Sequence, residues 1–127
     1  KLSEKIMVIK NPPREDVISA YAQTEFLILP SHWELSPLVP LESFAFKKPV
    51  ISSNAHGIPY TVIHNVNGIL VEPENITELS NAILHLIENK EKCEILGNRG
   101  YDLVTKECNS VEMAKATLQC YEDLLHD

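Results

Sequence analysis

Hydrophobic residues occur along this chain in two patterns, as short apolar runs and as apolar positions spaced at helical intervals. Apolar runs occupy residues 5–9, 26–29, 49–52 and 69–71, and proline, asparagine or glycine lies close to each of them. Runs of this length, separated by helical patterns, are typical of buried strands in a parallel sheet. The sequence therefore predicts four short parallel strands over these ranges.

Apolar positions at spacings of three and four predict five helices between and after the strands. The helical patterns cover residues 14–23, 37–47, 76–89, 92–106 and 110–125. Ser36 is the predicted N-cap of the second helix and Pro37 its first residue. The last helix is expected to turn Val111, Leu118 and Leu125 toward the core. This alternation indicates an α/β fold of three layers with a helical C-terminal tail.

Two glutamates flank the start of the second predicted helix. Glu34 lies in the polar loop before it, and Glu42 lies in its second turn. In parallel α/β folds, ligands bind at the carboxyl ends of the strands, where helix N-termini offer free amides to anions. This layout suits a ligand with a phosphate between two polar groups. An acidic loop beside a solvated helix glutamate would give the same spacing.

The segment around these glutamates resembles the donor-site signature of the GT-B glycosyltransferases of family 4, the glycosyl transferases group 1. That signature has Pro-Ser after a strand and two glutamates eight positions apart, as in this chain. It continues with a Leu-Glu-Ala-like segment and a Pro-Val-Ile strand. The matching segments are Pro30-Ser31, Glu34, Leu41-Glu42-Ser43, Pro49-Val50-Ile51, Gly57-Ile58-Pro59, Thr61-Val62-Ile63 and Asn67-Gly68-Ile69-Leu70-Val71.

The resemblance implies that residues 1–127 are a single, truncated C-terminal domain, the Rossmann-like donor half of a GT-B enzyme. In the strand order 3-2-1-4-5-6, the strand over 5–9 would be third, beside strands that this sequence does not include. The resemblance also places an acceptor-binding N-terminal domain, and an Arg and a Lys that meet the diphosphate, outside this sequence. The chain alone would then transfer nothing. The missing part could also associate peripherally with a membrane.

The implied activity is the retaining transfer of a hexosyl group from a nucleotide-diphosphate sugar to a sugar, lipid or other acceptor. Glu34 would be the catalytic residue, in contact with the donor sugar, and Glu42 would accept the ribose hydroxyls. The amides of Leu38 and Val39, with Ser36, would meet the distal phosphate. The family's donor sites need no metal or other cofactor. The implied donor-binding residues are Ser31, Glu34, Ser36, Leu38, Val39 and Glu42, with His56 and Gly57 as candidate ligand contacts.

Two alternatives stay open, a non-catalytic Rossmann-like module that binds a nucleotide or a protein, and a sugar-nucleotide epimerase of the same fold. The chain departs from the family at two positions, where His56 replaces a glycine and Tyr60 a glutamate. The family's contact through that glutamate therefore cannot be carried over. An Arg and Lys pair upstream of this sequence would favour the transferase.

The composition of the chain limits which binding partners and which cellular compartment we expect. The length of 127 residues suits one domain with a single core. A net charge of −7, from 18 acidic and 11 basic residues, argues against a nucleic-acid partner. Cys93, Cys108 and Cys120 follow no metal-ligand spacing, which favours free thiols in a reducing compartment. We therefore expect a cytoplasmic protein, or one at the cytoplasmic face of a membrane.

Overall fold

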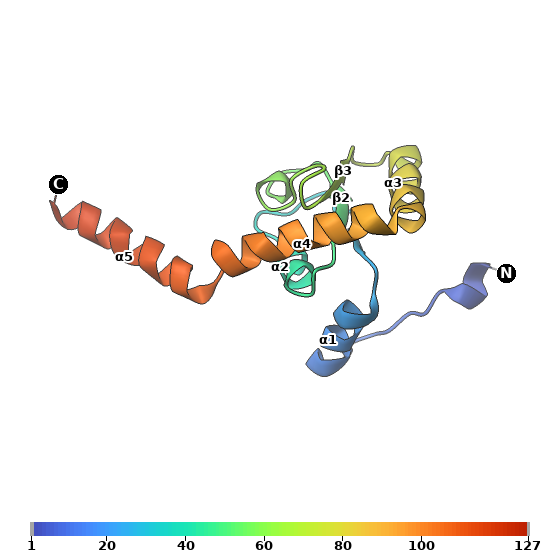
Figure 1. The fold of residues 1–127 in the computed structure, drawn as a ribbon, viewed down its shortest axis with the longest axis horizontal. Coiled ribbons are helices and arrows are strands. Elements are labelled where there is room, and N and C mark those ends of the chain that lie inside the picture. The colour runs from blue at the N-terminus through green and yellow to red at the C-terminus, as the bar shows by residue number, and fades with distance from the viewer. Residues whose placement is uncertain (1, 127) are drawn as a thin grey trace.

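The computed structural model describes residues 2–126, which form a three-stranded parallel sheet with helices around it (Figure 1). This is the predicted mixed α/β architecture with a parallel sheet. The elements in chain order are η1 (Leu2–Lys5), α1 (Arg14–Gln23), β1 (Leu27–Leu29), α2 (Leu38–Ala45), β2 (Val50–Ser53), η2 (Ile58–Tyr60), β3 (Gly68–Val71), α3 (Ile76–Glu88), α4 (Lys90–Lys106) and α5 (Ser110–His126).

The strands lie in the order β1-β2-β3, and both pairings are parallel. Ile28 pairs with Ile51, which in turn pairs with Ile69. All four residues of β2 are buried, as expected for a central strand covered on both faces. The order matches the last three strands of the expected sheet. Among the described residues, the outer edge of β1 has no strand beside it.

Successive side chains of a strand point to opposite faces, and the two faces of this sheet form two separate cores. On one face, Ile51 and Ile69 pack with Leu86 of α3. On the other face, Val50 packs with Phe44 of α2 and Ile58 of η2. Helix α4 contributes to both cores and lies against α2 and α3. These contacts produce the predicted three layers.

Glycines in α4 allow it to pack closely against α2. A Cβ at Gly97 would collide with the carbonyl oxygen of Lys47, and one at Gly100 would collide with the ring of Phe44. Helix α2 ends just there, because Lys47 adopts a left-handed φ of 58°. The amide of Lys48 then donates to the carbonyl of Ser43 at 3.1 Å, which caps the helix end.

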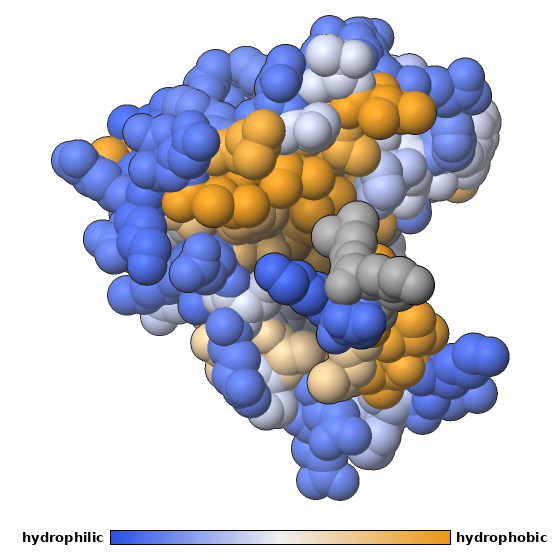
Figure 2. All heavy atoms as spheres, turned by 90° about the vertical axis from the view of Figure 1, so that its right-hand side faces the viewer, coloured by the Kyte–Doolittle hydropathy of each residue, from blue (hydrophilic) through white to orange (hydrophobic). Residues whose placement is uncertain are grey.

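The predicted strand over residues 5–9 is wrong, since the structure has an extended segment without strand pairing after η1. Its apolar side chains are exposed, from 58% at Ile9 to 82% at Met7. A strand needs a hydrogen-bonded neighbour, and no other described segment provides one beside these residues. Figure 2 views the side where Figure 1 places α3 and the N-terminal segment, and shows a broad apolar area around a hollow.

Helix α5 forms over nearly the predicted range. Within the described residues 2–126, however, its apolar side chains do not pack against the core as expected. Val111, Leu118 and Leu125 are 59%, 57% and 82% exposed. Figure 1 shows α5 extending away from the sheet beyond the end of α4. The sequence pattern therefore predicted the helix correctly, but its expected packing against the core was wrong. No helix within the described residues combines the length and the apolarity needed to cross a membrane.

The three cysteines are free thiols, as the sequence predicted. Cys93 is buried, and its thiol donates to the carbonyl oxygen of Glu25 at 3.3 Å. Cys108 and Cys120 are exposed. Burial raises the pKa of the Cys93 thiol, so this side chain behaves as a small core residue.

Candidate functional site

Two loops meet at the carboxyl ends of β1 and β2 and define the centre of the candidate site. The amide of Gly57 donates to the carbonyl oxygen of Glu34 at 2.8 Å. A Cβ at Gly57 would collide with the carbonyl oxygen of Leu35, so only glycine permits this close approach. The hydrogen bond and the tight fit join the two loops and fix the backbone of Glu34.

The side chain of Glu34 is oriented from within its own loop. The hydroxyl of Ser31 donates to Glu34 Oε1 at 3.1 Å, and both residues are partly buried. Three of the residues expected from the sequence, Ser31, Glu34 and Gly57, are therefore brought together. Glu34 Oε1 has one hydrogen-bond donor from the protein in this contact, and a carboxylate can accept further donors from a ligand.

An aromatic pair lies beside Glu34. The ring centroids of Trp33 and His56 are 3.9 Å apart with an interplanar angle of 46°. His56 has a left-handed φ of 48°, at the position where the family has a glycine. Both side chains are exposed, and His56 is in contact with the ring of Trp33.

The N-terminus of α2 differs from the prediction in its capping. Pro37, with ψ 123°, is the N-cap, and no side chain caps the helix, so Ser36 does not fill that role. An N-cap residue has non-helical backbone angles, which Pro37 adopts here. Leu38 and Val39 form the first turn and are 67% and 37% exposed. The first amides of a helix have no intrahelical acceptors, so this turn faces solvent as a donor surface.

Glu42 is held by two side chains of α1 that sequence reasoning did not identify. Arg14 Nη1 donates to Glu42 Oε1 at 2.7 Å, and the Tyr21 hydroxyl donates to Oε2 at 3.1 Å. Burial, with a smaller contribution from the hydrogen bond to Glu42, raises the pKa of Tyr21 to about 12. The two residues lie 28 and 21 positions before Glu42, so spacing alone gave no signal for either.

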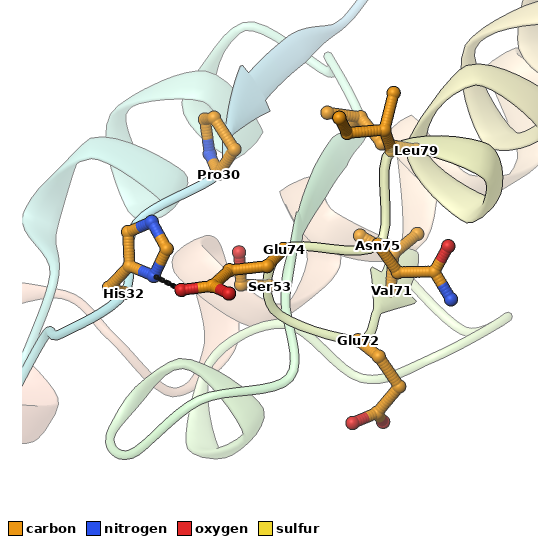
Figure 3. Close-up of a pocket in the computed structure, with 9 residues that line it drawn as sticks. Pro30, His32, Ser53, Val71, Glu72, Glu74, Asn75 and Leu79 are labelled. Carbon is orange, nitrogen blue, oxygen red and sulfur yellow. Dashed lines mark ion pairs between the residues drawn. The ribbon is translucent and has the colours of Figure 1, made fainter.

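A cavity of about 270 Å³ opens at the carboxyl ends of all three strands (Figure 3). Pro30 follows β1, while Ser53 and Val71 end β2 and β3. His32 Nδ1 lies 3.7 Å from Glu74 Oε1 across the cavity mouth, an ion pair when the imidazole is protonated. Neither residue was predicted from the sequence, because their contact depends on how the loops after β1 and β3 are placed.

The geometry thus groups the expected residues in two places. Ser31, Glu34, His56 and Gly57 cluster where the loops after β1 and β2 meet. Glu42 projects from the second turn of α2 toward α1. The exposed first turn of α2 lies between the two glutamates in the chain.

Comparisons with known proteins agree with this architecture. The model of the family described as glycosyl transferases group 1 matches residues 1–103. An uncharacterized glycosyltransferase of Methanocaldococcus jannaschii is 33% identical over 110 residues, which are 87% of this chain and 31% of that protein. The chain thus spans about a third of that relative.

Solved structures share the fold. Sucrose-phosphate synthase from Thermosynechococcus elongatus superposes with a TM-score of 0.88 at 28% identity, covering 98% of this chain and 31% of that one. The Anabaena protein HepE, solved in complex with UDP, gives 0.80 at 24% identity, covering 87% of this chain and 30% of that one. The family match over residues 1–103 decides the assignment, and this chain belongs to the glycosyl transferases group 1 family.

Proposed function

We propose that this chain binds the nucleotide-diphosphate sugar of a retaining glycosyltransferase, and that the whole protein transfers a hexosyl group to a sugar, lipid or other acceptor. The observation that carries the proposal is the placement of Glu34 and Glu42 around the N-terminus of α2, at the carboxyl ends of parallel strands. This is where ligands bind in parallel α/β folds. Family membership supports glycosyl transfer over the alternatives of a non-catalytic module and an epimerase.

The proposed donor lies across the first turn of α2. Glu42 accepts hydrogen bonds from the ribose hydroxyls, because a half-buried carboxylate is a strong acceptor. The amides of Leu38 and Val39, with the Ser36 hydroxyl, donate to the distal phosphate, where the helix end favours negative charge. The UDP complex of the Anabaena protein makes uridine nucleotides the first donors to test.

Glu34 is the proposed catalytic residue. Its backbone is fixed by Gly57 and its carboxylate is oriented by Ser31, so it is already positioned before the donor binds. Retaining transfer by front-face displacement develops positive charge on the donor sugar, which a nearby carboxylate stabilises. The departing phosphate takes the acceptor proton, so this mechanism requires no separate protein base. The step is complete without a metal ion or cofactor.

The test is a donor screen on the full-length protein. UDP-, GDP- and ADP-sugars are incubated with acceptor mixtures, and release of nucleoside diphosphate is followed together with the anomeric configuration of the product. We expect one nucleotide class to be consumed, with retained configuration. Loss of that turnover in Glu34→Ala, but not in the exposed-site control Glu88→Gln, is expected. Product of inverted configuration, or nucleotide binding without transfer to any acceptor, would contradict the proposal.

A further inference from the structure

The carboxylate of Glu42 is fixed at both oxygens by helix α1. Tyr21 donates its hydroxyl to Oε2 at 3.1 Å, and Arg14 donates Nη1 to Oε1 at 2.7 Å. These contacts join residues from two separate helices, so they set the direction in which Glu42 projects from α2. Neither contact belongs to the residues that the donor-site signature specifies.

The two contacts differ in rigidity. Tyr21 is only 9% exposed, and its ring stacks on Phe46 with centroids 5.8 Å apart and an interplanar angle of 14°. The Arg14 side chain is 69% exposed, so water and salt screen its ion pair with Glu42. The stacked ring therefore gives the Tyr21 hydroxyl a fixed position, whereas Arg14 can move. Tyr21 is the contact that determines the orientation of the carboxylate.

The remaining acceptor capacity of Glu42 matches a specific ligand group. An ionised carboxylate has about four lone-pair positions, two on each oxygen. Tyr21 and Arg14 each use one, on different oxygens, so each oxygen keeps one position for a ligand hydroxyl. Two neighbouring hydroxyls, such as the 2′ and 3′ hydroxyls of a ribose, can occupy these positions together only when the carboxylate plane is held.

We propose that Tyr21 is a positioning residue that orients the Glu42 carboxylate to recognise the paired 2′ and 3′ hydroxyls of a ribonucleotide. This inference rests on the proposed donor-binding function, which already assigns the ribose hydroxyls to Glu42, and adds the residue that fixes the direction of its carboxylate. It predicts discrimination against 2′-deoxyribonucleotides, which lack one of the two hydroxyls. Tyr21 acts through Glu42 and does not itself touch the nucleotide.

The experiment measures binding of UDP and 2′-deoxy-UDP, and of GDP and 2′-deoxy-GDP, to the full-length protein by calorimetric titration. The wild type is expected to prefer the ribo form by roughly tenfold to a hundredfold, the value of one hydrogen bond to a charged group. Tyr21→Phe is expected to lower this ratio at least threefold, chiefly by weakening the ribo form. Tyr121→Phe, an exposed tyrosine on α5, is the matched control and should keep the full ratio.

Glu42→Gln separates the inference from the function on which it rests. If Glu42→Gln abolishes the preference while Tyr21→Phe keeps all of it, the positioning role of Tyr21 is overturned and the donor site stands. If Glu42→Gln keeps the preference, or the wild type has none, the ribose contact of the proposed function is itself overturned. Because each ratio is measured on one protein sample, partial unfolding of a variant does not imitate the expected result.

Discussion

Glu34 and Glu42 are held by different neighbours, and the difference separates their expected effects on catalysis. Glu34 is tied to the loop after β2 through Gly57, at the place proposed for the reacting sugar. Glu42 is tied to α1, at the place proposed for the ribose. A contact made equally in the ground state and the transition state affects binding, whereas one that strengthens in the transition state affects turnover.

We expect Glu42→Gln in the full-length enzyme to weaken donor binding by about 1.5–3 kcal/mol, because it replaces a charged acceptor with a neutral one. Glu34→Ala is expected to lower kcat more than it weakens donor affinity, since charge develops on the sugar only during transfer. Steady-state kinetics and calorimetric titration with the same donor measure the two effects. Wild-type kinetics in both variants would contradict the site assignment.

Tyr21 provides a pH-dependent contribution to stability. Its pKa is raised from 10.0 to about 12, mainly by burial and then by the hydrogen bond to Glu42, so the folded state favours the protonated phenol. The stabilisation is therefore complete below pH 10 and is lost as the pH rises from 10 toward 12. Urea denaturation at pH 9, 10 and 11 should show a fall in the free energy of unfolding that is smaller in Tyr21→Phe. Equal falls in both proteins would contradict the raised pKa.

The sequence predicted the glutamates of the site but not what holds them. Ser31 and Glu34 fall within one loop, so their contact follows from chain order, whereas Gly57 reaches Glu34 from the loop after β2. Arg14 and Tyr21 reach Glu42 only because α1 packs beside α2, and no spacing rule reports how two helices are placed. The cap at Pro37 was also missed, because Ser36 satisfied the usual N-cap preference.

At the scale of elements, the packing of α4 on α2 depends on two glycines in the interior of a helix. Gly97 and Gly100 lie on the face of α4 that meets Lys47 and Phe44. Glycine costs about 1 kcal/mol in a helix interior relative to alanine. Helix α4 nevertheless runs without a break over Lys90–Lys106. We attribute the two glycines in it to the close approach between α4 and α2 that they permit.

We expect Gly100→Ala to lower the free energy of unfolding by about 1–2 kcal/mol, because overpacking against the buried Phe44 ring outweighs the gain in helix propensity. Asn98→Ala, at an exposed position of the same helix, is the control and should be neutral or slightly stabilising. Chemical denaturation of both variants measures the difference. A stabilised Gly100→Ala protein would show that α4 can move away from α2 at little cost.

Sequence periodicity predicted four strands and five helices, and three of the strands and all five helices are present in the structure. The strands over 26–29, 49–52 and 69–71 were confirmed to within one residue at each end, because their hydrogen-bonding partners lie within the chain. The run over 5–9 is also rich in apolar residues but has no neighbouring strand among the described residues. Periodicity reports which side chains favour burial, and strand formation also requires a backbone partner.

At the scale of the whole molecule, charge opposes the proposed ligand. The net charge of −7 repels a diphosphate, and Pro37 and Pro40 have no amide hydrogen to donate at the start of α2. The exposed end of a helix contributes only about 0.3–1 kcal/mol to anion binding. Charge-assisted hydrogen bonds from an Arg and a Lys would add roughly 1.5–3 kcal/mol each.

We therefore expect residues 1–127 alone to bind the donor at least a hundredfold more weakly than the full-length protein, at about 1.4 kcal/mol per tenfold, and to transfer nothing. Calorimetric titration of both proteins with the same donor, at one ionic strength, tests the affinity. Equal micromolar affinities would show that the diphosphate is held within residues 1–127, without basic residues from elsewhere.

The open edge of β1 has a consequence for this chain as an isolated molecule in solution. No strand among the described residues pairs with this edge, so its backbone groups form a template on which a second copy can add a strand, and Ile28 on β1 is 38% exposed. We expect residues 1–127 to self-associate with rising concentration, measured by sedimentation velocity. Ile28→Lys, a charged residue on the edge strand, should restore the monomer, while the control Ile87→Lys on the exposed side of α3 should leave the association unchanged. Dissociation by Ile28→Lys alone would show that the two sheets join edge to edge, whereas equal behaviour of the two variants would show that the copies meet elsewhere on the surface.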